Sequence, residues 1–297
     1  MPLPGHPTGV DNKMPAQIAL HIGAHKTATT HLQRSLSEQS DALARVGARF
    51  YGPPYFRNGP EIAERFGLTG AVSADAAQDA FKQMAGDAKR VILSEENFIG
   101  TMHNRFARMA FPLYPKAQDR ISALAKMIAP DGFDVFLGLR NPATYITSCY
   151  CQALLGGRKV VLDEVKADNR IDAIDWADLV ARIKNTPGVR SLTVWRYEDY
   201  TALFPRITQD MTGAKVAPRK ERVHPGLSQD AVARILMRYA DGKGRNAAIR
   251  ARDMFPAGPD HRAFDAFDAE EHDAAATQYA AQINQIAAMG DVTLLKA

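Results

Sequence analysis

This chain of 297 residues is poor in cysteine and in excess charge of either sign, and each shortage excludes a class of protein. The only two cysteines, Cys149 and Cys151, lie two positions apart in a predicted helix, where they project on different faces and do not easily form a disulfide. A disulfide-dependent small domain is excluded, and a reducing compartment is favoured. The net charge of +4 argues against a protein that coats nucleic acid, but it leaves room for a small anionic ligand.

Long hydrophobic runs are also absent. The longest uncharged stretch, residues 141–157, contains Asn, Thr, Ser and Gln, so we do not expect it to span a membrane. The N-terminus lacks the basic and apolar regions of a signal peptide, and we expect residues 1–16 to form a flexible leader. The remaining residues, 17–297, are enough for one large α/β domain. Because we expect neither a membrane span nor a signal peptide, we predict a soluble cytoplasmic protein.

Four short apolar runs have the continuous pattern of strands that are covered on both faces of a parallel sheet. They are Gln17–Ile22, Arg90–Ser94, Phe133–Leu139 and Ser191–Arg196. Amphipathic helical patterns lie between them, at Thr27–Ser40, Ala117–Ala129 and Trp176–Lys184. Strands that alternate with helices predict a three-layer α/β fold with a central, mainly parallel sheet.

The chain after Tyr200 has a different pattern. Helices are expected at Ser228–Ala240 and His272–Met289, and one short strand at Val292–Leu295, so we expect residues 201–297 to be mostly helical. Residues 215–252 contain ten lysines and arginines against three acidic residues. Such a run is typical of a solvated face, and it is also typical of a surface that binds an anion.

The strongest functional signal is the turn after the first predicted strand, Gly23-Ala24-His25-Lys26-Thr27-Ala28-Thr29-Thr30. A short turn between a strand and a helix leaves the first helical amides without partners, at the positive end of the helix dipole. Lys26 adds a positive charge, and the three threonines add hydroxyl donors, whereas an ordinary capped turn needs only one hydroxyl. This pattern predicts a phosphate-binding loop.

The same turn departs from two common nucleotide-binding motifs. It lacks the glycine that directly precedes the lysine in G-x-x-x-x-G-K-[ST], because Gly23 precedes Lys26 by three residues. The loop is therefore shorter, and a nucleoside triphosphate with Mg²⁺ is not the expected ligand. It also lacks G-x-G-x-x-G, which disfavours a dinucleotide fold.

A second candidate site follows the third predicted strand. Asn141 is a good helix N-cap and Pro142 a good first helical residue, while Arg140 ends the strand and Ser148 lies two turns into the helix. The guanidinium and the hydroxyl can bind one phosphate together, although each residue alone also fits an ordinary exposed position. Carboxyl ends of parallel strands are where open α/β sheets bind ligands, which favours the site.

Together these segments resemble the sulfotransferases that use 3′-phosphoadenosine 5′-phosphosulfate. Residues 21–33 (HIGAHKTATTHLQ) resemble the family's 5′-phosphosulfate loop, and residues 139–150, with Arg140, Pro142, Ser148 and Tyr150, resemble its 3′-phosphate motif. Residues 195–200 (WRYEDY) resemble a strand end of the family, and residues 222–228 are more loosely similar to its late donor-binding loop. The resemblance covers residues 17–200 and implies a fold related to P-loop kinases.

The resemblance also implies a role for each matching residue. Lys26 would contact the bridging oxygen of the phosphosulfate and stabilise charge on the leaving group. The donor-binding residues would be Gly23, Ala24, His25, Lys26, Thr27, Ala28, Thr29 and Thr30 at the 5′-phosphate, Arg140, Ser148 and Arg222 toward the 3′-phosphate, and Tyr197 near the adenine. Two positions depart from the family: Ala28 replaces a glycine, and His31 stands where many members have a tryptophan.

Sulfuryl transfer to a hydroxyl or amine also needs a base that removes the proton of the acceptor. Glu95 and Glu96 follow the strand Arg90–Ser94, at the position where the resemblance implies a catalytic residue. Two adjacent carboxylates raise the pKa of one of them, which suits a base. The resemblance matches Glu96 with the family's glutamate and Glu95 with a serine, and it therefore implies Glu96 as the base, with Glu95 as its alternative. Both are nearly as well explained as solvated acids or as ion-pair partners of Arg90 or Arg140.

Two histidines are further candidate bases: His25, inside the loop, and His103, seven residues after Glu96. A metal is not expected, because His21, His25 and His31 fall on a strand, a loop and a helix without the spacing of metal ligands.

The sequence thus predicts a soluble sulfotransferase whose C-terminal helices shape the acceptor pocket. The acceptor is expected to be a small molecule, a glycan or a lipid rather than a nucleic acid, and the oligomeric state is left open. Two rival functions are a P-loop nucleotide kinase and a nucleotide-binding module without catalysis.

Overall fold

The computed structural model describes residues 17–58, 73–129, 131–220, 226–240 and 245–297, and the predicted leader lies outside them. The described residues contain one sheet of six strands in the order β2-β3-β1-β4-β5-β6, and every neighbouring pair of strands is parallel. The strands are β1 (Gln17–His21), β2 (Ala48–Tyr51), β3 (Arg90–Ser94), β4 (Phe133–Leu139), β5 (Val189–Arg196) and β6 (Val292–Leu294). The four long predicted strands and the short C-terminal one are confirmed.

The strand β2 is an addition that the sequence pattern did not predict. It is four residues long, lies at the edge of the sheet, and only Ala48 in it is fully buried. A short edge strand lacks the continuous apolar run by which the buried strands were recognised.

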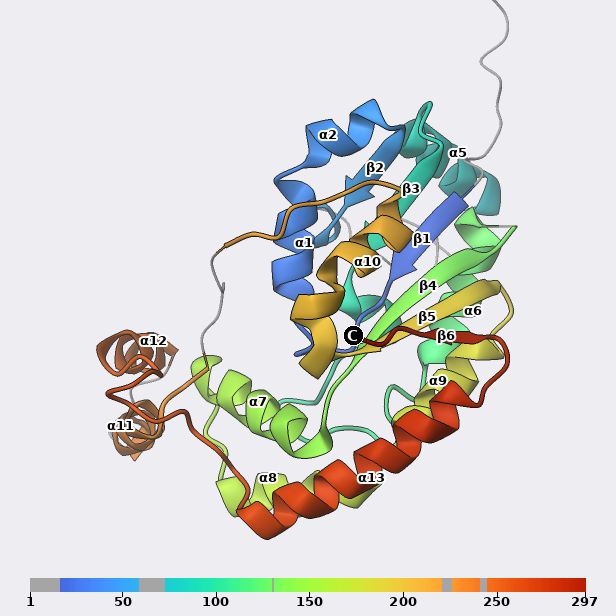
Figure 1. The fold of residues 1–297 in the computed structure, drawn as a ribbon. Helices are drawn as coiled ribbons and strands as arrows, with labels where there is room; N and C mark the ends of the chain where they lie inside the picture. Colours follow the sequence, from blue (N-terminus) through green and yellow to red (C-terminus); the bar gives the residue numbers. More distant parts are fainter. Residues whose placement is uncertain (1–16, 59–72, 130, 221–225, 241–244) are drawn as a thin grey trace, which may run out of the picture.

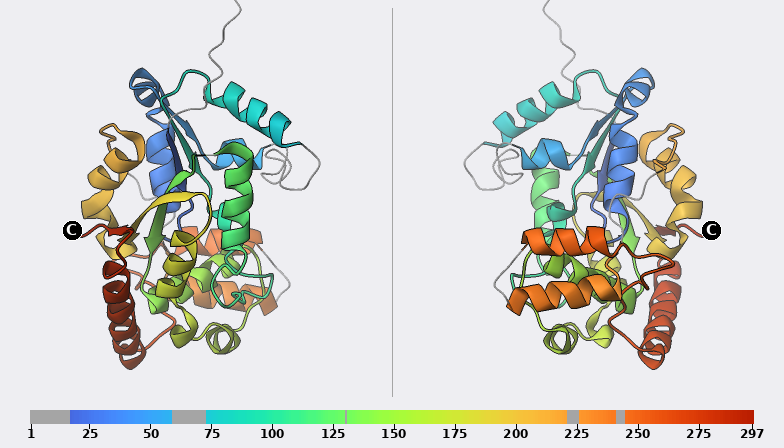
Figure 2. Two further views of the ribbon diagram at one scale, coloured as in Figure 1. Left: turned by 90° about the vertical axis from the view of Figure 1, so that its right-hand side faces the viewer. Right: turned by 90° about the vertical axis from the view of Figure 1, so that its left-hand side faces the viewer.

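Helices cover both faces of the sheet, so the predicted three-layer α/β architecture is confirmed (Figure 2). One face carries α1 (Thr29–Ser37) and α10 (Tyr200–Thr212), and the other carries α5 (Ala74–Ala85), α6 (Ala117–Ile128) and α9 (Trp176–Lys184). Side chains of β1 alternate between the two faces: Ala19 packs with α1 and α10, whereas Ile18 and Leu20 pack with the opposite helices.

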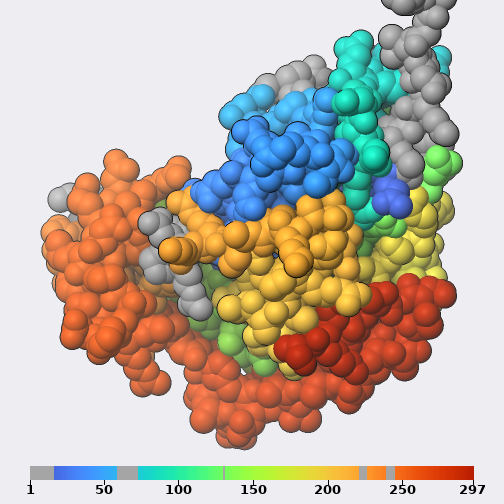
Figure 3. Space-filling view, turned by 45° about the horizontal axis from the view of Figure 1, so that its top comes forward, coloured from blue at the N-terminus to red at the C-terminus, as the bar shows by residue number. Residues whose placement is uncertain are grey.

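The remaining helices lie beyond the carboxyl ends of the strands or at the edge of the sheet (Figure 1). They are α2 (Ser40–Arg45), α3 (Pro53–Arg57), α7 (Pro142–Leu155), α8 (Leu162–Asp168), α11 (Gln229–Ala240), α12 (Arg245–Met254) and α13 (Ala269–Ala287). The helices α11 and α12 pack on each other and on α7, and they form a lobe at one side of the molecule (Figure 3). Helices are thus the main elements of the described residues after Tyr200, with β6 as the strand that follows them.

Helix boundaries show where local chemistry decided the start of an element. The helix predicted at Thr27–Ser40 begins only at Thr29, because Lys26 and Ala28 have positive φ angles of 67° and 65° that a helix does not allow. The helix α13 begins before the predicted His272, at a capping box formed by Asp268 and Glu271. No helix in the described part of the chain has the length and hydropathy needed to cross a membrane.

Candidate functional site

The order of the strands brings the predicted segments together. The chain leaves β1 at the centre of the sheet, passes to β2 and β3 on one side, and then continues to β4, β5 and β6 on the other. Such a reversal leaves a crevice at the carboxyl ends of the central strands, where open α/β folds bind ligands. Four predicted segments end there: residues 23–28 after β1, 95–96 after β3, 140–141 after β4, and Tyr197 after β5.

Residues 23–28, here called the Lys26 loop, have the backbone of an anion site. Positive φ angles at Lys26 and Ala28 alternate with the ordinary conformation of Thr27. The amides of residues 26–30 donate no hydrogen bond to any described residue, and α1 has no side-chain cap. Successive amides in such alternating conformations turn toward one concave space, so this backbone is suited to hold an oxyanion.

The Lys26 loop packs tightly on the sheet, and two glycines permit this contact. A Cβ atom at Gly138 in β4 would lie 2.9 Å from Oγ1 of Thr27, and one at Gly23 would lie 2.6 Å from Cγ2 of Thr29. Real side chains at either position would therefore displace the loop from the sheet. The lack of a side chain at Gly138 and Gly23 therefore allows the loop backbone to take this position.

Two of the three predicted threonine donors already have partners within the protein. Oγ1 of Thr27 donates to the carbonyl of Ala24 at 2.5 Å, and Oγ1 of Thr29 donates to a carboxylate oxygen of Glu96 at 2.5 Å. These hydroxyls stabilise the loop and α1, and Thr30 is half-buried. That all three threonines bind the donor stays a prediction.

The side chain of Lys26 enters a site that is rich in positive charge. Burial lowers the pKa of its ammonium group, and the guanidinium of Arg140 lowers that pKa further. The thiols of Cys149 and Cys151, from α7, lie near enough to Lys26 to interact with it. Both thiols are free and buried, and burial raises the pKa of Cys149 to about 12, so at neutral pH they are packing residues, as the sequence predicted.

The junction after β4, residues 139–142, satisfies its backbone within the chain. Asn141 is the N-cap of α7, and its side-chain oxygen accepts from the amides of Ala143 and Thr144 at 3.0 and 3.5 Å. The amide of Asn141 itself donates to Glu198 at 2.8 Å. The predicted cap and the predicted Pro142 at the first helical position are confirmed, and this junction offers side chains rather than amides to a ligand.

Arg140 links this junction to the Lys26 loop. Its Nη1 donates to the carbonyl of Lys26 at 2.9 Å, its Nε donates to Oγ1 of Thr144 at 3.0 Å, and its guanidinium carbon lies 4.2 Å from the centre of the Tyr197 ring. The guanidinium has no carboxylate partner in these contacts and is partly exposed. Ser148 is half-buried one position before Cys149, which interacts with Lys26.

Arg222, the remaining predicted donor-binding residue, lies outside the described residues.

The two glutamates differ from the prediction in their ion-pair partners. Glu95 is fully buried, and its carboxylate accepts from Nε and Nη2 of Arg57 at 2.8 and 2.6 Å. Glu96 accepts from Thr29, from Gln33 at 3.2 Å and from Arg57 at 3.2 Å. The expected ion-pair partners Arg90 and Arg140 are thus incorrect, because the β2-α3 segment supplies Arg57 instead.

The expectation that adjacency raises the pKa of one glutamate is wrong for Glu96. Burial by itself raises the pKa of this carboxyl group, but the hydrogen bonds from Thr29, from its own backbone amide and from Gln33 hold the pKa below its ordinary value. A carboxylate with a depressed pKa and donors on both oxygens is a weak base. It is well suited to hold Thr29, and with it the start of α1, in place.

Three histidines lie in and around the Lys26 loop: His21, His25 and His31. Burial lowers the pKa of His21 and of His25 to about 4. Nδ1 of His25 lies 2.9 Å from the hydroxyl of Tyr114. Nε2 of His31 donates to the carbonyl of Arg219 at 2.8 Å, and its Nδ1 lies 2.7 Å from the hydroxyl of Tyr200, so His31 fixes the segment after α10 to α1.

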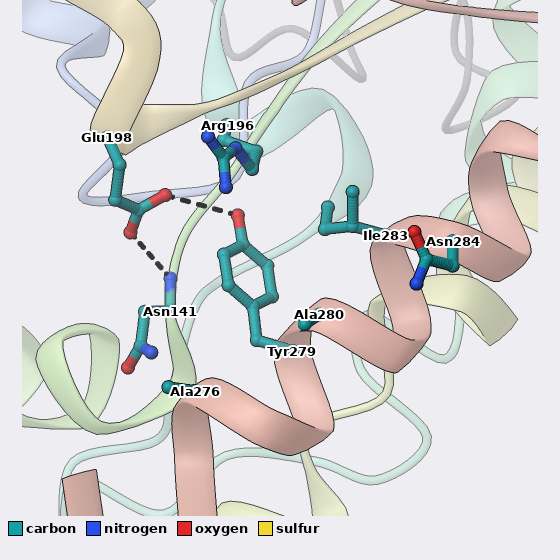
Figure 4. A pocket seen from close by; sticks show the side chains of 8 residues that line it. All are labelled: Asn141, Arg196, Glu198, Ala276, Tyr279, Ala280, Ile283 and Asn284. Atoms are coloured by element: carbon teal, nitrogen blue, oxygen red, sulfur yellow. Dashed lines mark hydrogen bonds between the residues drawn. The ribbon is translucent and has the colours of Figure 1, made fainter. Parts of the chain in front are cut away.

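A shallow groove of about 330 Å³ lies behind the Arg140 junction, between the end of β5 and α13 (Figure 4). Glu198 forms its inner wall, where it accepts from the amide of Asn141 and, at 3.3 Å, from the hydroxyl of Tyr279 (Figure 4). Arg196 at its rim is paired with Asp199 at 2.7 Å. Because Glu198, Tyr279 and Arg196 already pair within the protein, we assign this groove a supporting role for the Arg140 junction.

Sequence reasoning missed three residues that shape the site: Arg57, Gln33 and Tyr114. Arg57 is 38 positions from Glu95 and follows the short strand that was not predicted, so no local pattern marked it. Gln33 lies one helical turn after Thr29, on the buried side of α1. This spacing predicts that the two side chains share one face of the helix, and the pairing of β1 with β3 brings Glu96 to that face. Tyr114 contacts His25 from a segment without regular structure.

Neither a scan against protein-family models nor a search of curated proteins finds a match to this chain. The functional argument therefore rests on the site itself.

Proposed function

We propose that this protein is a sulfotransferase that moves a sulfuryl group from 3′-phosphoadenosine 5′-phosphosulfate to a hydroxyl or amine of a small-molecule, sugar or lipid acceptor. The proposal includes a fold related to P-loop kinases and an acceptor pocket shaped by the helices after Tyr200. The observation that carries it is the pairing of two unlike anion sites. Among the described residues, the amides of residues 26–30 make no hydrogen bond, and Lys26 adds a positive charge beside them. Nη1 of Arg140 lies 2.9 Å from the carbonyl of Lys26, and the guanidinium has no carboxylate partner in the same part of the chain.

The donor has two phosphate groups, and the two sites suit them. The amides of the Lys26 loop suit the 5′-phosphosulfate, which needs many donors around one group. Arg140 and Ser148 suit the isolated 3′-phosphate, and the ring of Tyr197, which lies against Arg140, gives the adenine an aromatic neighbour. His31 has both ring nitrogens engaged, so in this proposal it positions the segment after α10 rather than the base of the nucleotide.

Lys26 is the residue to which we assign leaving-group stabilisation. In an in-line displacement the acceptor oxygen attacks sulfur while the bond from sulfur to the bridging oxygen breaks, and negative charge collects on the departing phosphate. The ammonium of Lys26 and the amides that follow it oppose that charge in a site from which burial excludes much of the water. Glu96 holds Thr29, and Arg57 holds Glu95 and Glu96, so these charges keep the loop in one position.

Ligand binding tests the proposal without knowledge of the acceptor. Thermal unfolding of the full chain is measured with adenosine 3′,5′-bisphosphate, with ATP and Mg²⁺, and with adenosine 5′-monophosphate. The bisphosphate should stabilise the fold most, by about 2.7 kcal/mol when its concentration is about 100 times Kd. Stabilisation by ATP and Mg²⁺ alone would instead indicate a phosphotransferase.

Transfer itself is then measured with radiolabelled donor and pools of phenols, alcohols, amines and sugars. A chain that binds the bisphosphate and labels no acceptor in any pool would be a binding module, and the catalytic part of the proposal would be wrong.

A further inference from the structure

Arg158 follows the end of α7 and uses only one corner of its guanidinium within the described part of the chain. Its Nη1 donates to the carbonyl of Asn104 at 2.8 Å and lies 2.9 Å from Nδ1 of His103. Its Nε and Nη2 make no hydrogen bond with any described residue, and the side chain is partly exposed. Nε and Nη2 together form the edge of a guanidinium that binds a carboxylate through two parallel hydrogen bonds. Arg158 therefore presents an anion-binding edge.

The partner of Arg158 is a tight turn of residues 103–108, here called the Asn104 turn. Oδ1 of Asn104 accepts from the amides of Phe106 and Arg108 at 2.8 and 3.2 Å. The amide of Asn104 donates to the carbonyl of Arg108 at 2.9 Å. Because these bonds hold the carbonyl of Asn104 in place, they also fix the direction in which the guanidinium of Arg158 points.

His103 places this guanidinium beside the Lys26 loop. Burial lowers the pKa of His103, and the positive charges of Arg158 and Lys26 lower it further, so both cations lie near the ring. The sulfur atoms of Met102 and Cys149 are 3.0 Å apart, and Cys149 interacts with Lys26, so the residue before the Asn104 turn joins the same cluster. Nε2 of His103 is buried without a partner among the described residues. Such an atom costs free energy, and a bound ligand is a partner that would satisfy it.

The surface around Arg158 is cationic and partly apolar. Residues 101–110 and 155–161 contain four arginines and lysines and no acidic residue. The side chain of Phe106, in the Asn104 turn, is 56% exposed, and the guanidinium of Arg105 lies 4.6 Å from the centre of its ring. A molecule with a ring and a negative charge finds both contacts here, whereas a cationic molecule is repelled.

The one carboxylate that bonds to this turn does not neutralise Arg158. Asp168, at the end of α8, pairs with Arg108 at 2.6 Å. The charge of Arg158 is therefore left for a ligand, at a place separate from Arg140 at the other end of α7.

Building on the proposed sulfotransferase activity, we propose that the acceptor is a carboxylate-bearing molecule whose carboxylate binds the Nε–Nη2 edge of Arg158. Its apolar part packs on Phe106, and its hydroxyl or amine receives the sulfuryl group at the Lys26 loop. A carboxylate has a single negative charge and two coplanar oxygens, which match one guanidinium edge. Arg158 is a specificity-determining residue: it selects the acceptor and takes no part in making or breaking a bond.

Binding at Arg158 is tested first, without turnover. In ¹⁵N–¹H spectra of the full chain with adenosine 3′,5′-bisphosphate, the Nε signal that disappears in Arg158→Gln belongs to Arg158. The probe 4-hydroxyphenylacetate should shift this signal saturably, with a Kd at least about tenfold below that of tyrosol, the neutral alcohol of the same skeleton. A signal that 4-hydroxyphenylacetate does not move up to about 10 mM, or that tyrosol moves equally, would overturn the proposal.

The class of anion is tested in the same spectra with (4-hydroxybenzyl)phosphonate. We expect it to bind Arg158 no more tightly than the carboxylate does. A Kd more than about tenfold lower for the phosphonate would replace the carboxylate with a phosphate-bearing acceptor.

Kinetics with labelled donor give the next test, with three phenols that differ in charge: 4-hydroxyphenylacetate, tyrosol and the cationic tyramine. We expect kcat/KM to fall in that order. Arg158→Gln should lower kcat/KM for 4-hydroxyphenylacetate about tenfold or more, through KM, and leave tyrosol within about twofold. Arg158→Glu should reverse the preference toward tyramine. Arg108→Gln removes a charge of the Asn104 turn that is already paired with Asp168, and this control should keep the wild-type preference.

The outcomes separate this inference from the proposed function. If the wild-type chain neither binds adenosine 3′,5′-bisphosphate nor transfers label, the sulfotransferase proposal is wrong and the acceptor inference falls with it. If the wild type transfers label but prefers tyrosol or tyramine, only the role of Arg158 is refuted. Arg158→Gln should bind the bisphosphate with a Kd within about twofold of wild type, which also shows that the variant is folded. A loss of more than about tenfold would place Arg158 at the donor and contradict its role at the acceptor.

Discussion

Two strand-to-helix junctions, the Lys26 loop after β1 and the Arg140 junction after β4, solve the same problem in opposite ways. At the Lys26 loop the helix begins after Ala28 in a left-handed conformation, without a side-chain cap, and the amides of residues 26–30 have no partner among the described residues. At the Arg140 junction Pro142 has no amide hydrogen to donate. The amides of Ala143 and Thr144 donate to the side chain of Asn141, and the amide of Asn141 donates to Glu198. The first junction keeps its backbone for a ligand, and the second offers only side chains.

Under the proposed function, this difference gives the fold two candidate anion sites that lie close together and are unlike in their chemistry. Free amides surround one compact group, whereas a guanidinium on a rigid, capped turn recognises a second group at a defined separation. The Lys26 loop carries backbone strain, because two of its non-glycine residues, Lys26 and Ala28, adopt positive φ. The hydrogen bonds of Thr27 and Thr29 offset that strain.

The largest expected effect concerns the charge at the first junction. Lys26→Met keeps most of the aliphatic side chain and removes the ammonium, so sulfuryl transfer should fall about 1000-fold in kcat, the upper end for loss of one group that stabilises a leaving oxygen. The measurement is turnover of labelled donor with the acceptor found in the pools. Lys126→Met, an exposed residue on α6, is the control and should transfer normally. A Lys26→Met chain with wild-type kcat would remove the catalytic role of the loop.

The next effect separates the two junctions by ligand. Arg140→Ala should raise the Kd of adenosine 3′,5′-bisphosphate about 100-fold, as expected for loss of a charge-assisted contact to phosphate. The Kd of adenosine 5′-monophosphate, which lacks the 3′-phosphate, should change by less than about threefold. Isothermal titration calorimetry measures both constants. Equal losses for the two nucleotides would mean that Arg140 acts only through the carbonyl of Lys26. Arg196→Ala, which removes a surface ion pair with Asp199, should change neither constant.

The smallest effect compares the two helix starts directly. Ala28→Gly relieves a positive φ and should stabilise the fold by about 1 kcal/mol, whereas Asn141→Ala removes a cap and should destabilise it by about 1 kcal/mol. Urea unfolding measures both changes. If Ala28→Gly lowers the free energy of unfolding, the left-handed conformation at Ala28 is not a source of strain, and the contrast between the junctions is lost.

Much of this architecture was readable from local pattern. Continuous apolar runs predicted β1, β3, β4 and β5, because strands covered on both faces must be apolar throughout. Asn141 and Pro142 predicted the start of α7, since capping depends on a few neighbouring atoms. The Lys26 loop was recognised for a similar reason: its residue types and their order are local properties.

The parts that failed depend on partners far along the chain. The pKa of Glu96 was expected to rise, yet it falls, because Thr29 and Gln33 of α1 supply donors that only the pairing of β1 with β3 brings near. Arg57 joins both glutamates across 38 or more positions. Nothing near position 103 in the sequence shows that Nε2 of His103 would be buried without a partner among the residues that the structure describes.

The sequence by itself determined the elements and the places where ligand-binding groups leave the sheet, because both follow from hydrophobic periodicity and local backbone chemistry. Only the tertiary structure decided which of those groups are free and which are already satisfied. Hydrogen bonds and buried charges depend on atoms brought together by strand order, and strand order is not a local property. Within the described ranges Lys26 and Arg140 have no carboxylate partner, while Glu95 and Glu96 are held by Arg57, Thr29 and Gln33.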